Sequence, residues 1–252
     1  VSWQIPTDFP MYYHDIKVDY TSASSITIRA GSAVRSSDNT KNILVSSPLV
    51  VDLTALGAGG LDTGSETTDT WYYLYLIYNN TTDTVSAVFS IVNESATGSI
   101  TLPVGYTHKR QLKIAIKNDS SGNIMPFDYF DNNTIFYRLP QTVISAGGAT
   151  VWTNIDCTAY IPPIGLRSIF SYRITVTNAV PTLSSLSLRN SDGNYESELC
   201  RELTHDKAAL YYISGDILLP TGTSRIMQYK TQDADMKLKS LYISSFTVTE
   251  VW

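Results

Sequence analysis

Segment after segment of this chain alternates apolar and polar residues, and turn-forming residues separate the segments. A period of two is that of a β-strand with one buried face, and the segments are rich in the β-branched and aromatic residues that favour strands. With 252 residues, the chain can bury a core without help from metals or disulfides. The pattern therefore predicts an all-β protein.

The expected strands fall into two series. The first series is expected at 16–20, 25–30, 43–52, 71–79, 85–92, 111–117 and 126–129, and the second at 134–145, 150–157, 168–177, 183–189, 208–218, 224–230 and 238–252. Residues 196–207 are compatible with a short helix, a strand or a loop. Each series has the size of a β-sandwich.

We therefore expect three parts along the chain: an N-terminal arm at 1–19, a first β-sandwich-like domain at 20–131, and a second, jelly-roll-like sandwich at 132–252. Whether these tandem sandwiches are of the jelly-roll or the immunoglobulin-like type is left open by the pattern. The stretch WYYLYLIY at 71–78 lacks clean alternation. Such a strand buries both faces, so we expect it at the centre of the core.

Composition and charge limit the classes of partner that this chain can bind. Charged residues are only 16% of the chain and the net charge is −5, with no basic block. Nucleic acid, which requires clustered Lys and Arg, is therefore an unsuitable partner. No apolar run reaches the length of a membrane-spanning helix. Because the chain begins at Val1 with no secretory leader, we expect a processed or trimmed soluble protein.

The two cysteines, Cys157 and Cys200, have no CxxC or His spacing around them. Zinc binding is therefore not expected. Without a secretory leader the two thiols are expected to be buried and reduced, although a pairing between them is left open.

The string Asp62-Thr63-Gly64 matches the catalytic loop of an aspartic protease. Such an enzyme needs two carboxylates that share a proton, because only the pair splits into one acid and one base. The chain has no second Asp-Thr/Ser-Gly string, and the residues before Asp62 are too rich in Gly for the supporting strand. We therefore interpret 57–69 as a mobile surface loop that leads into the strand at Trp71.

Other catalytic or metal sites have weaker signals. The three histidines, His14, His108 and His205, lie in no recognisable motif, so a Ser-His-Asp nucleophile is not indicated. A glycosidase pair of carboxylates is spatial rather than sequential, and no residue is singled out. The segment 190–196, NSDGNYE, alternates oxygen side chains as a calcium loop does, but a hairpin turn fits it better. We predict no enzyme activity, no catalytic residue and no cofactor.

Tyrosine is unusually common, with 17 Tyr against 7 Phe and 4 Trp. Its apolar face and polar tip suit sugar stacking and wet protein interfaces. Much of this Tyr content is also ordinary for strands, so it does not single out particular contact residues.

A set of short motifs resembles a β-rich module of tailed-bacteriophage virion proteins, especially tail-fibre and related appendage proteins. In that module a Gly-Leu-Asp-Thr-Gly loop leads into a Trp-Tyr strand, an LP-x-GY turn, an Arg-bearing strand and a Ser-Gly hairpin. The matching residues, in order, are Gly60 to Gly64, Trp71-Tyr72, Leu102-Pro103, Gly105-Tyr106, Arg110 and Ser121-Gly122. The resemblance covers about residues 20–130, and the segment 151–176 resembles more loosely the sandwich domains that follow.

The resemblance implies a non-enzymatic structural component of a phage particle, either a tail-fibre-like appendage or a head decoration. It implies a virion location, contacts with other virion proteins, and a homo-oligomer for which a trimer is favoured. A host-surface glycan is a further partner that it suggests. The alternative is a carbohydrate-binding module with Tyr and Trp as stacking platforms, and a protease or glycosidase is the least favoured.

Overall fold

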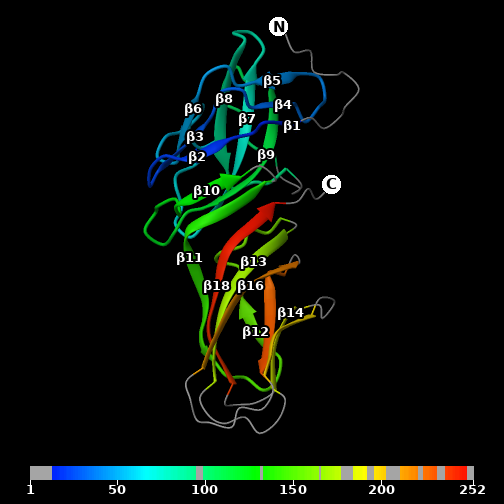
Figure 1. Ribbon diagram of the computed structural model, residues 1–252. Helices are drawn as coiled ribbons and strands as arrows, with labels where there is room; N and C mark the ends of the chain where they lie inside the picture. Colours follow the sequence, from blue (N-terminus) through cyan, green and yellow to red (C-terminus); the bar gives the residue numbers. More distant parts are fainter. Residues whose placement is uncertain are drawn as a thin grey trace. The chain divides into compact units, whose positions relative to one another are not determined.

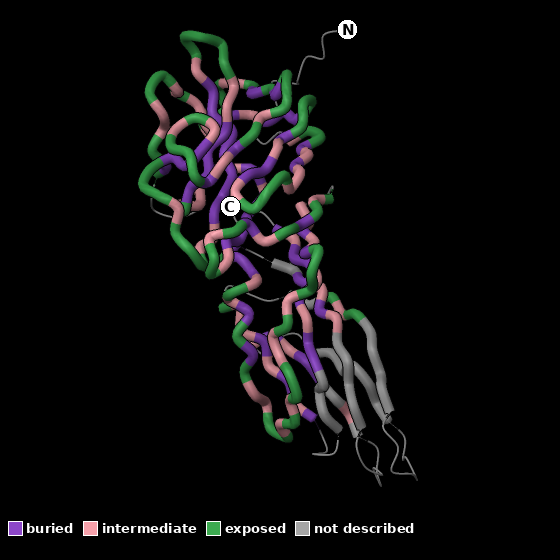
Figure 2. The backbone as a smooth tube through the Cα atoms, turned by 90° about the vertical axis from the view of Figure 1, so that its left-hand side faces the viewer, coloured by how far each residue is buried: buried purple, intermediate pink, exposed green. Residues whose placement is uncertain are grey.

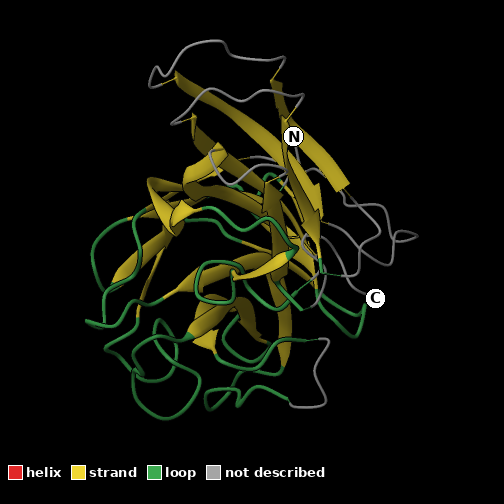
Figure 3. Ribbon diagram, turned by 90° about the horizontal axis from the view of Figure 1, so that it is seen from below, coloured by secondary structure: helices red, strands yellow, loops and turns green. Residues whose placement is uncertain are grey.

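The computed structural model describes residues 13–94, 99–130, 133–164, 166–176, 184–191, 196–202, 211–220, 224–231 and 236–248. Within these ranges every regular element is a β-strand, as Figure 3 shows, and the all-β prediction is confirmed. No helix among the described residues is long and apolar enough to cross a membrane. The internal contacts divide the chain into two units, and the boundary in the sequence falls between Asn133 and Thr134.

The first unit contains three groups of antiparallel strands (Figure 1). Their orders are β1-β4-β5, β10-β2-β3-β6 and β8-β7-β9. The bounds are β1 Tyr13–His14, β2 Val18–Tyr20, β3 Ser25–Ile28, β4 Ala33–Arg35, β5 Asn42–Leu44, β6 Leu49–Asp52, β7 Trp71–Asn79, β8 Thr84–Ser90, β9 His108–Lys117 and β10 Phe127–Phe130.

Strand β7 is the centre of the first unit, as its sequence predicts. Its seven inner residues are all buried, and β8 and β9 pair with it on its two edges. Figure 2 shows this concentration of buried positions inside the unit, with the exposed positions in the loops. An unbroken apolar and aromatic run forms a strand here because side chains on both of its faces pack against other residues.

The strands expected in the first half need two changes. The strand expected at 43–52 is two strands, β5 and β6, with an irregular stretch that contains Pro48 between them. Proline has no N–H for a strand ladder, which accounts for the break. Strand β4 was not predicted. Of the expected arm, residues 13–19 are described, and they form β1 and part of β2.

The segment 59–62 is not the mobile surface loop that we expected. It runs along β8: Gly59 N–H donates to Ala87 O, Phe89 N–H to Gly60 O, and Asp62 N–H to Phe89 O, each at 2.8 Å. Leu61 forms a parallel bridge with Phe89 and is only 3% exposed. The glycines let this backbone approach its neighbours closely, so the segment is part of the scaffold.

The second unit contains two antiparallel sheets. Their strand orders are β16-β13-β18-β11 and β12-β17-β14-β15. The bounds are β11 Thr134–Gly147, β12 Thr153–Asp156, β13 Leu166–Val176, β14 Ser184–Asn190, β15 Glu196–Glu202, β16 Tyr211–Pro220, β17 Ile226–Thr231 and β18 Met236–Val248. Residues 196–202, for which helix, strand and loop were open, are therefore a strand.

The pairing in the second unit is that of a jelly roll. The first strand of the unit pairs with the last, the second with the seventh, the third with the sixth, and the fourth with the fifth: β11 with β18, β12 with β17, β13 with β16, and β14 with β15. A strip of chain folded back on itself and then rolled into two sheets produces this order. The sandwich is therefore a jelly roll rather than immunoglobulin-like.

The inner faces of the two sheets supply the core of this sandwich. Strand β17 alternates strictly between half-buried and buried residues. Its buried Met227 faces a core that also contains the fully buried Leu188 from β14 and Phe170 from β13. The period of two that predicted strands thus also decides which side chains the sandwich encloses.

Gly60 provides a test of the close packing of the segment 59–62. A Cβ atom on Gly60 would lie 2.4 Å from the Ala55 carbonyl oxygen, whereas one on Gly64 (φ +75°) would meet nothing within 4 Å. We expect Gly60→Ala to lower the free energy of unfolding by about 3 kcal/mol. Gly64→Ala adds only backbone strain, of about 1 kcal/mol. Urea unfolding curves measure both, and equal effects would contradict the packed arrangement.

Candidate functional site

The carboxylate of Asp62 is a structural brace. It is 8% exposed, and its Oδ2 accepts hydrogen bonds from Ser90 Oγ at 2.9 Å and from the Thr101 backbone N–H at 3.1 Å. These bonds join the segment 59–62 to the end of β8 and to the start of the Leu102-Pro103 turn. In the part of the chain that the structure describes, no hydrogen bond joins Asp62 to a second carboxyl group, which an acid-base dyad requires.

Other members of the motif set have equally structural positions. Gly105 (φ +87°) lies so close to Asn79 that a Cβ would come within 2.6 Å of its Nδ2. Arg110 is buried, with its guanidinium carbon 5.2 Å from the centre of the Tyr13 ring. Gly122 has φ +82°, which its turn requires. The ordered motif set therefore specifies turns and close contacts of one scaffold.

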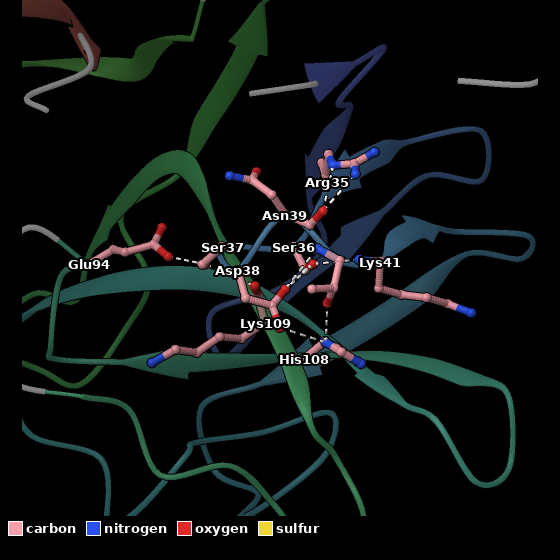
Figure 4. Close-up of polar contacts among 10 residues, drawn as sticks. Arg35, Ser36, Ser37, Asp38, Asn39, Lys41, Glu94, His108 and Lys109 are labelled. Atoms are coloured by element: carbon pink, nitrogen blue, oxygen red, sulfur yellow. Dashed lines mark hydrogen bonds and ion pairs between the residues drawn. The ribbon is translucent and has the colours of Figure 1, made fainter. Parts of the chain in front are cut away.

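A polar cluster joins the loop between β4 and β5 to the start of β9, and Figure 4 shows its members. We call residues 36–41 together with Glu94, His108 and Lys109 the loop clamp. Asp38 Oδ2 lies 3.2 Å from His108 Nδ1, and Thr40 Oγ1 lies 3.3 Å from the same nitrogen. In a catalytic triad the carboxylate and the hydroxyl bind opposite ring nitrogens. With both partners on Nδ1, the clamp does not have the geometry of a nucleophile.

Hydrogen bonds keep Asp38 ionised. Ser36 Oγ donates to Asp38 Oδ1 at 2.5 Å, and the Thr40 N–H donates to the same oxygen at 3.2 Å. Partial burial alone raises the pKa of the Asp38 carboxyl, but hydrogen bonds from Ser36, Thr40 and His108 outweigh it and lower the pKa to about 2. The clamp therefore holds a charged group in a fixed loop.

A second set of contacts also anchors the loop clamp on β9. The Ser37 N–H donates to Lys109 O at 2.8 Å, and the Ser37 hydroxyl contacts the Glu94 carboxylate. Glu94 in turn accepts a hydrogen bond from the Gln111 N–H at 3.3 Å. These contacts fix a loop of small polar residues against a buried strand, which is a structural role.

The remaining candidates separate in space. His14 lines a cavity in the first unit, whereas His205 lies outside the described residues. Cys157 is a free, buried thiol, and burial together with the charge of Asp156 raises its pKa to about 12. A thiol with so high a pKa is a poor nucleophile and metal ligand at neutral pH. The side chain of Cys200 is outside the described part of the chain.

The segment 190–196 connects β14 and β15, which pair as antiparallel neighbours. Residues 192–195 within it lie outside the described ranges. Among the residues that are described, no three His, Cys, Asp or Glu side chains gather as a metal site would require.

Cations lie near two of the tryptophan rings that composition alone suggested as stacking platforms. Arg189 lies with its guanidinium carbon 3.9 Å from the centre of the Trp152 ring, and Lys230 Nζ lies 4.9 Å from it. Lys117 Nζ lies 5.8 Å from the Trp71 ring. The cavity that His14 lines, at about 460 Å³, also contains Tyr13 and Tyr129. It is a concave site with aromatic side chains among its described lining residues.

The chain is thus an all-β protein whose second unit is a jelly roll. No family model matches it, and no curated protein matches it. Similar solved structures include a viral particle of IBDV (13% identity, 97% of this chain, 71% of that chain, TM-score 0.27). Others are the VP2 subviral particle of infectious bursal disease virus (12%, 97%, 74%, 0.27) and the Gx strain of that virus (11%, 96%, 73%, 0.25). Such low TM-scores assign the chain neither a family nor a function.

Substitution of Asp62 can distinguish a structural role of this residue from a catalytic one. Asp62→Ala removes two hydrogen bonds and leaves the buried Ser90 hydroxyl without its acceptor, so we expect a loss of about 2 kcal/mol in unfolding free energy. Asp62→Asn keeps an acceptor oxygen and is expected to cost less than half as much. Urea unfolding measures both variants. A peptidase activity on labelled casein that Asp62→Asn abolishes would contradict the structural role.

The loop clamp makes stability depend on pH in the acid range. The pKa of Asp38 is lowered from 3.8 to about 2 in the folded protein, so its contribution is present above about pH 4 and is lost as the pH falls toward about 2. Its side chain is 53% exposed, and solvent screening reduces the contribution to about 1 kcal/mol. Asp38→Asn should therefore destabilise the protein at neutral pH and not near pH 2. Unfolding curves at both pH values provide the check, and a difference independent of pH would contradict it.

Proposed function

We propose that this chain is a non-enzymatic structural component of a tailed-bacteriophage particle, either a tail-fibre-like appendage or a head decoration. It acts through contacts with other virion proteins, as a homo-oligomer for which a trimer is favoured. The observation that carries the proposal is the jelly-roll pairing of the second unit, in which strands pair from the two ends of the unit inward. Viral capsid domains are among the recurring users of this architecture.

The positions of the motif residues in the first unit support the same proposal. The residues that resemble the phage module position turns, a brace and a buried strand, as the contacts of Gly60, Asp62 and Gly105 illustrate. A module in which these signature residues have structural positions suits a protein that works by holding a shape. A fold hosts many functions, so the fold alone does not assign one. The phage context of the proposal comes from the resemblance, and the jelly-roll fold is compatible with it.

A carbohydrate-binding module is the second candidate. Lectin domains also use jelly rolls, and the first unit has a cavity with two tyrosines in its lining. The two candidates differ in where the chain resides, because a binding module alone needs no place in a particle. They are compatible if the particle component also attaches to a glycan.

Particle association is the direct test. Particles purified on a density gradient from a culture that produces this chain should contain its tryptic peptides, at a ratio to the major head protein that survives repeated banding. Light scattering of the purified chain should give a mass corresponding to three copies of 27.9 kDa. Deletion of the coding sequence should remove the corresponding density from particle images.

Two outcomes would count against the proposal. Peptides that wash away from the particles on rebanding would indicate a contaminant rather than a component. A strict monomer in light scattering at every concentration, together with particles that are unchanged by the deletion, would overturn the structural role.

A further inference from the structure

A cavity in the first unit has a mixed lining from three separated parts of the chain. Its volume of about 460 Å³ lies within the range of small-molecule sites. Strand β1 and the turn after it, strand β9, strand β10 and the end of the unit supply the wall. The lining residues are Tyr13, His14, Asp15, Ile16, Lys113, Tyr129 and Asn133.

Tyr13 is held in place from several sides. Its hydroxyl donates to Gln111 O at 3.0 Å. Lys113 Nζ lies 4.7 Å and the Arg110 guanidinium carbon 5.2 Å from the centre of its ring. These cation–π contacts fix the ring as part of the wall and place the ammonium group of Lys113 at the cavity.

Tyr129 gives the cavity an apolar surface with an ordered polar tip. Its hydroxyl donates to Asn133 Oδ1 at 3.3 Å, so the amide of Asn133 is oriented at the cavity edge. Ile16, which is 9% exposed, adds a further apolar contribution to the lining. A tyrosine ring beside an aliphatic side chain suits the C–H face of a ring-shaped ligand.

Asp15 supplies a fixed acceptor. Its backbone has φ +48°, and its carbonyl oxygen accepts a hydrogen bond from Ser32 Oγ at 3.3 Å. Its carboxylate lies 2.8 Å from Lys17 Nζ, and this hydrogen-bonded lysine lowers the pKa of the carboxyl group. The described lining therefore includes an ionised carboxylate that already pairs with Lys17.

The lining chemistry selects one class of ligand. A purely apolar molecule would desolvate the charged groups of Asp15 and Lys113 and offer them no hydrogen bond in return, which is costly. A multiply charged anion would meet the carboxylate of Asp15. A sugar ring has an apolar C–H face for Tyr129 and hydroxyl groups around its edge, which can donate to Asp15 and accept from Lys113 and Asn133.

We propose that this cavity binds a pyranose unit of a glycan, with Tyr129 as the stacking surface and Asp15 as the principal hydroxyl acceptor. This sugar site goes beyond the particle role and does not depend on it. A protein absent from every particle could still bind the sugar, and a particle component could lack the site.

Saturation-transfer NMR on the full chain tests the sugar site, with free glucose, galactose, mannose, N-acetylglucosamine and rhamnose as probes and inorganic phosphate as a competitor. We expect at least one sugar to bind in the millimolar range. Tyr129→Ala should weaken its binding by about tenfold through loss of stacking. Asp15→Asn should weaken it about fivefold, because Asn also accepts a left-handed backbone and only the charge is lost.

Phe130→Ala is the matched control, since Phe130 is the neighbouring aromatic residue on the opposite face of β10, is 55% exposed and does not line the cavity. It should leave binding unchanged, and circular dichroism should be the same for all variants. Three results would overturn the sugar site: no binding of any probe sugar, binding that Tyr129→Ala and Asp15→Asn leave intact, or complete displacement of the sugar by phosphate. Tyr129→Phe keeps the ring and should retain sugar binding even if Tyr129→Ala unfolds. Loss of sugar binding in a folded Tyr129→Phe variant would also count against stacking.

Discussion

Buried tyrosine hydroxyls on β7 are the constraint on which the first unit depends. A tyrosine ring can be buried cheaply, but its hydroxyl needs a hydrogen-bond partner once water is excluded. Tyr72 Oη accepts from the Thr67 N–H at 2.8 Å, Tyr75 Oη donates to Val92 O at 2.9 Å, and Tyr78 Oη contacts the Asp83 carboxylate. Each partner belongs to a segment that flanks β7 or follows β8. Burial of the central strand therefore also orders the connections around it.

The same requirement gives Asp62 and the loop clamp their form. Segments that lie against a buried strand must satisfy their own polar groups, so the segment 59–62 takes a ladder position beside β8 and Asp62 receives Ser90 and the Thr101 N–H. In the loop between β4 and β5, the contact between Asp38 and His108 satisfies polar groups in the same way. Short side chains with oxygen acceptors are suited to this task because they bond nearby backbone groups. Residues that look catalytic in the sequence are thus used to close polar networks.

The local sequence pattern predicted the fold class and the positions of strands. It did not predict which strands pair or which side chains meet across long sequence distances. The all-β class follows from residue type and period, and the bounds of Trp71–Asn79 follow from an unbroken apolar and aromatic run. The pairing of β11 with β18 depends on contacts across about a hundred residues, which no local period encodes. Asp62 was misjudged for the same reason. Gly, Asp and Thr favour exposed turns, but this Asp is buried and its carboxylate accepts hydrogen bonds from Ser90 and Thr101, which are distant in the sequence. The cavity joins β1, β9 and β10, so no sequence motif could have indicated it.

Aromatic content overstates the surface available for stacking, because cations in this fold lie over several of the rings. The Tyr13 ring has Lys113 and Arg110 near it, and the Trp152 ring has Arg189 and Lys230. A ring covered in this way stabilises the sheet and orients the cation, but it offers less bare surface to a sugar. Tyr129 lines a cavity in which all the other described lining residues except Ile16 carry hydrogen-bonding side chains. Stacking capacity therefore depends on which ring faces open space, and not on the number of tyrosines in the chain.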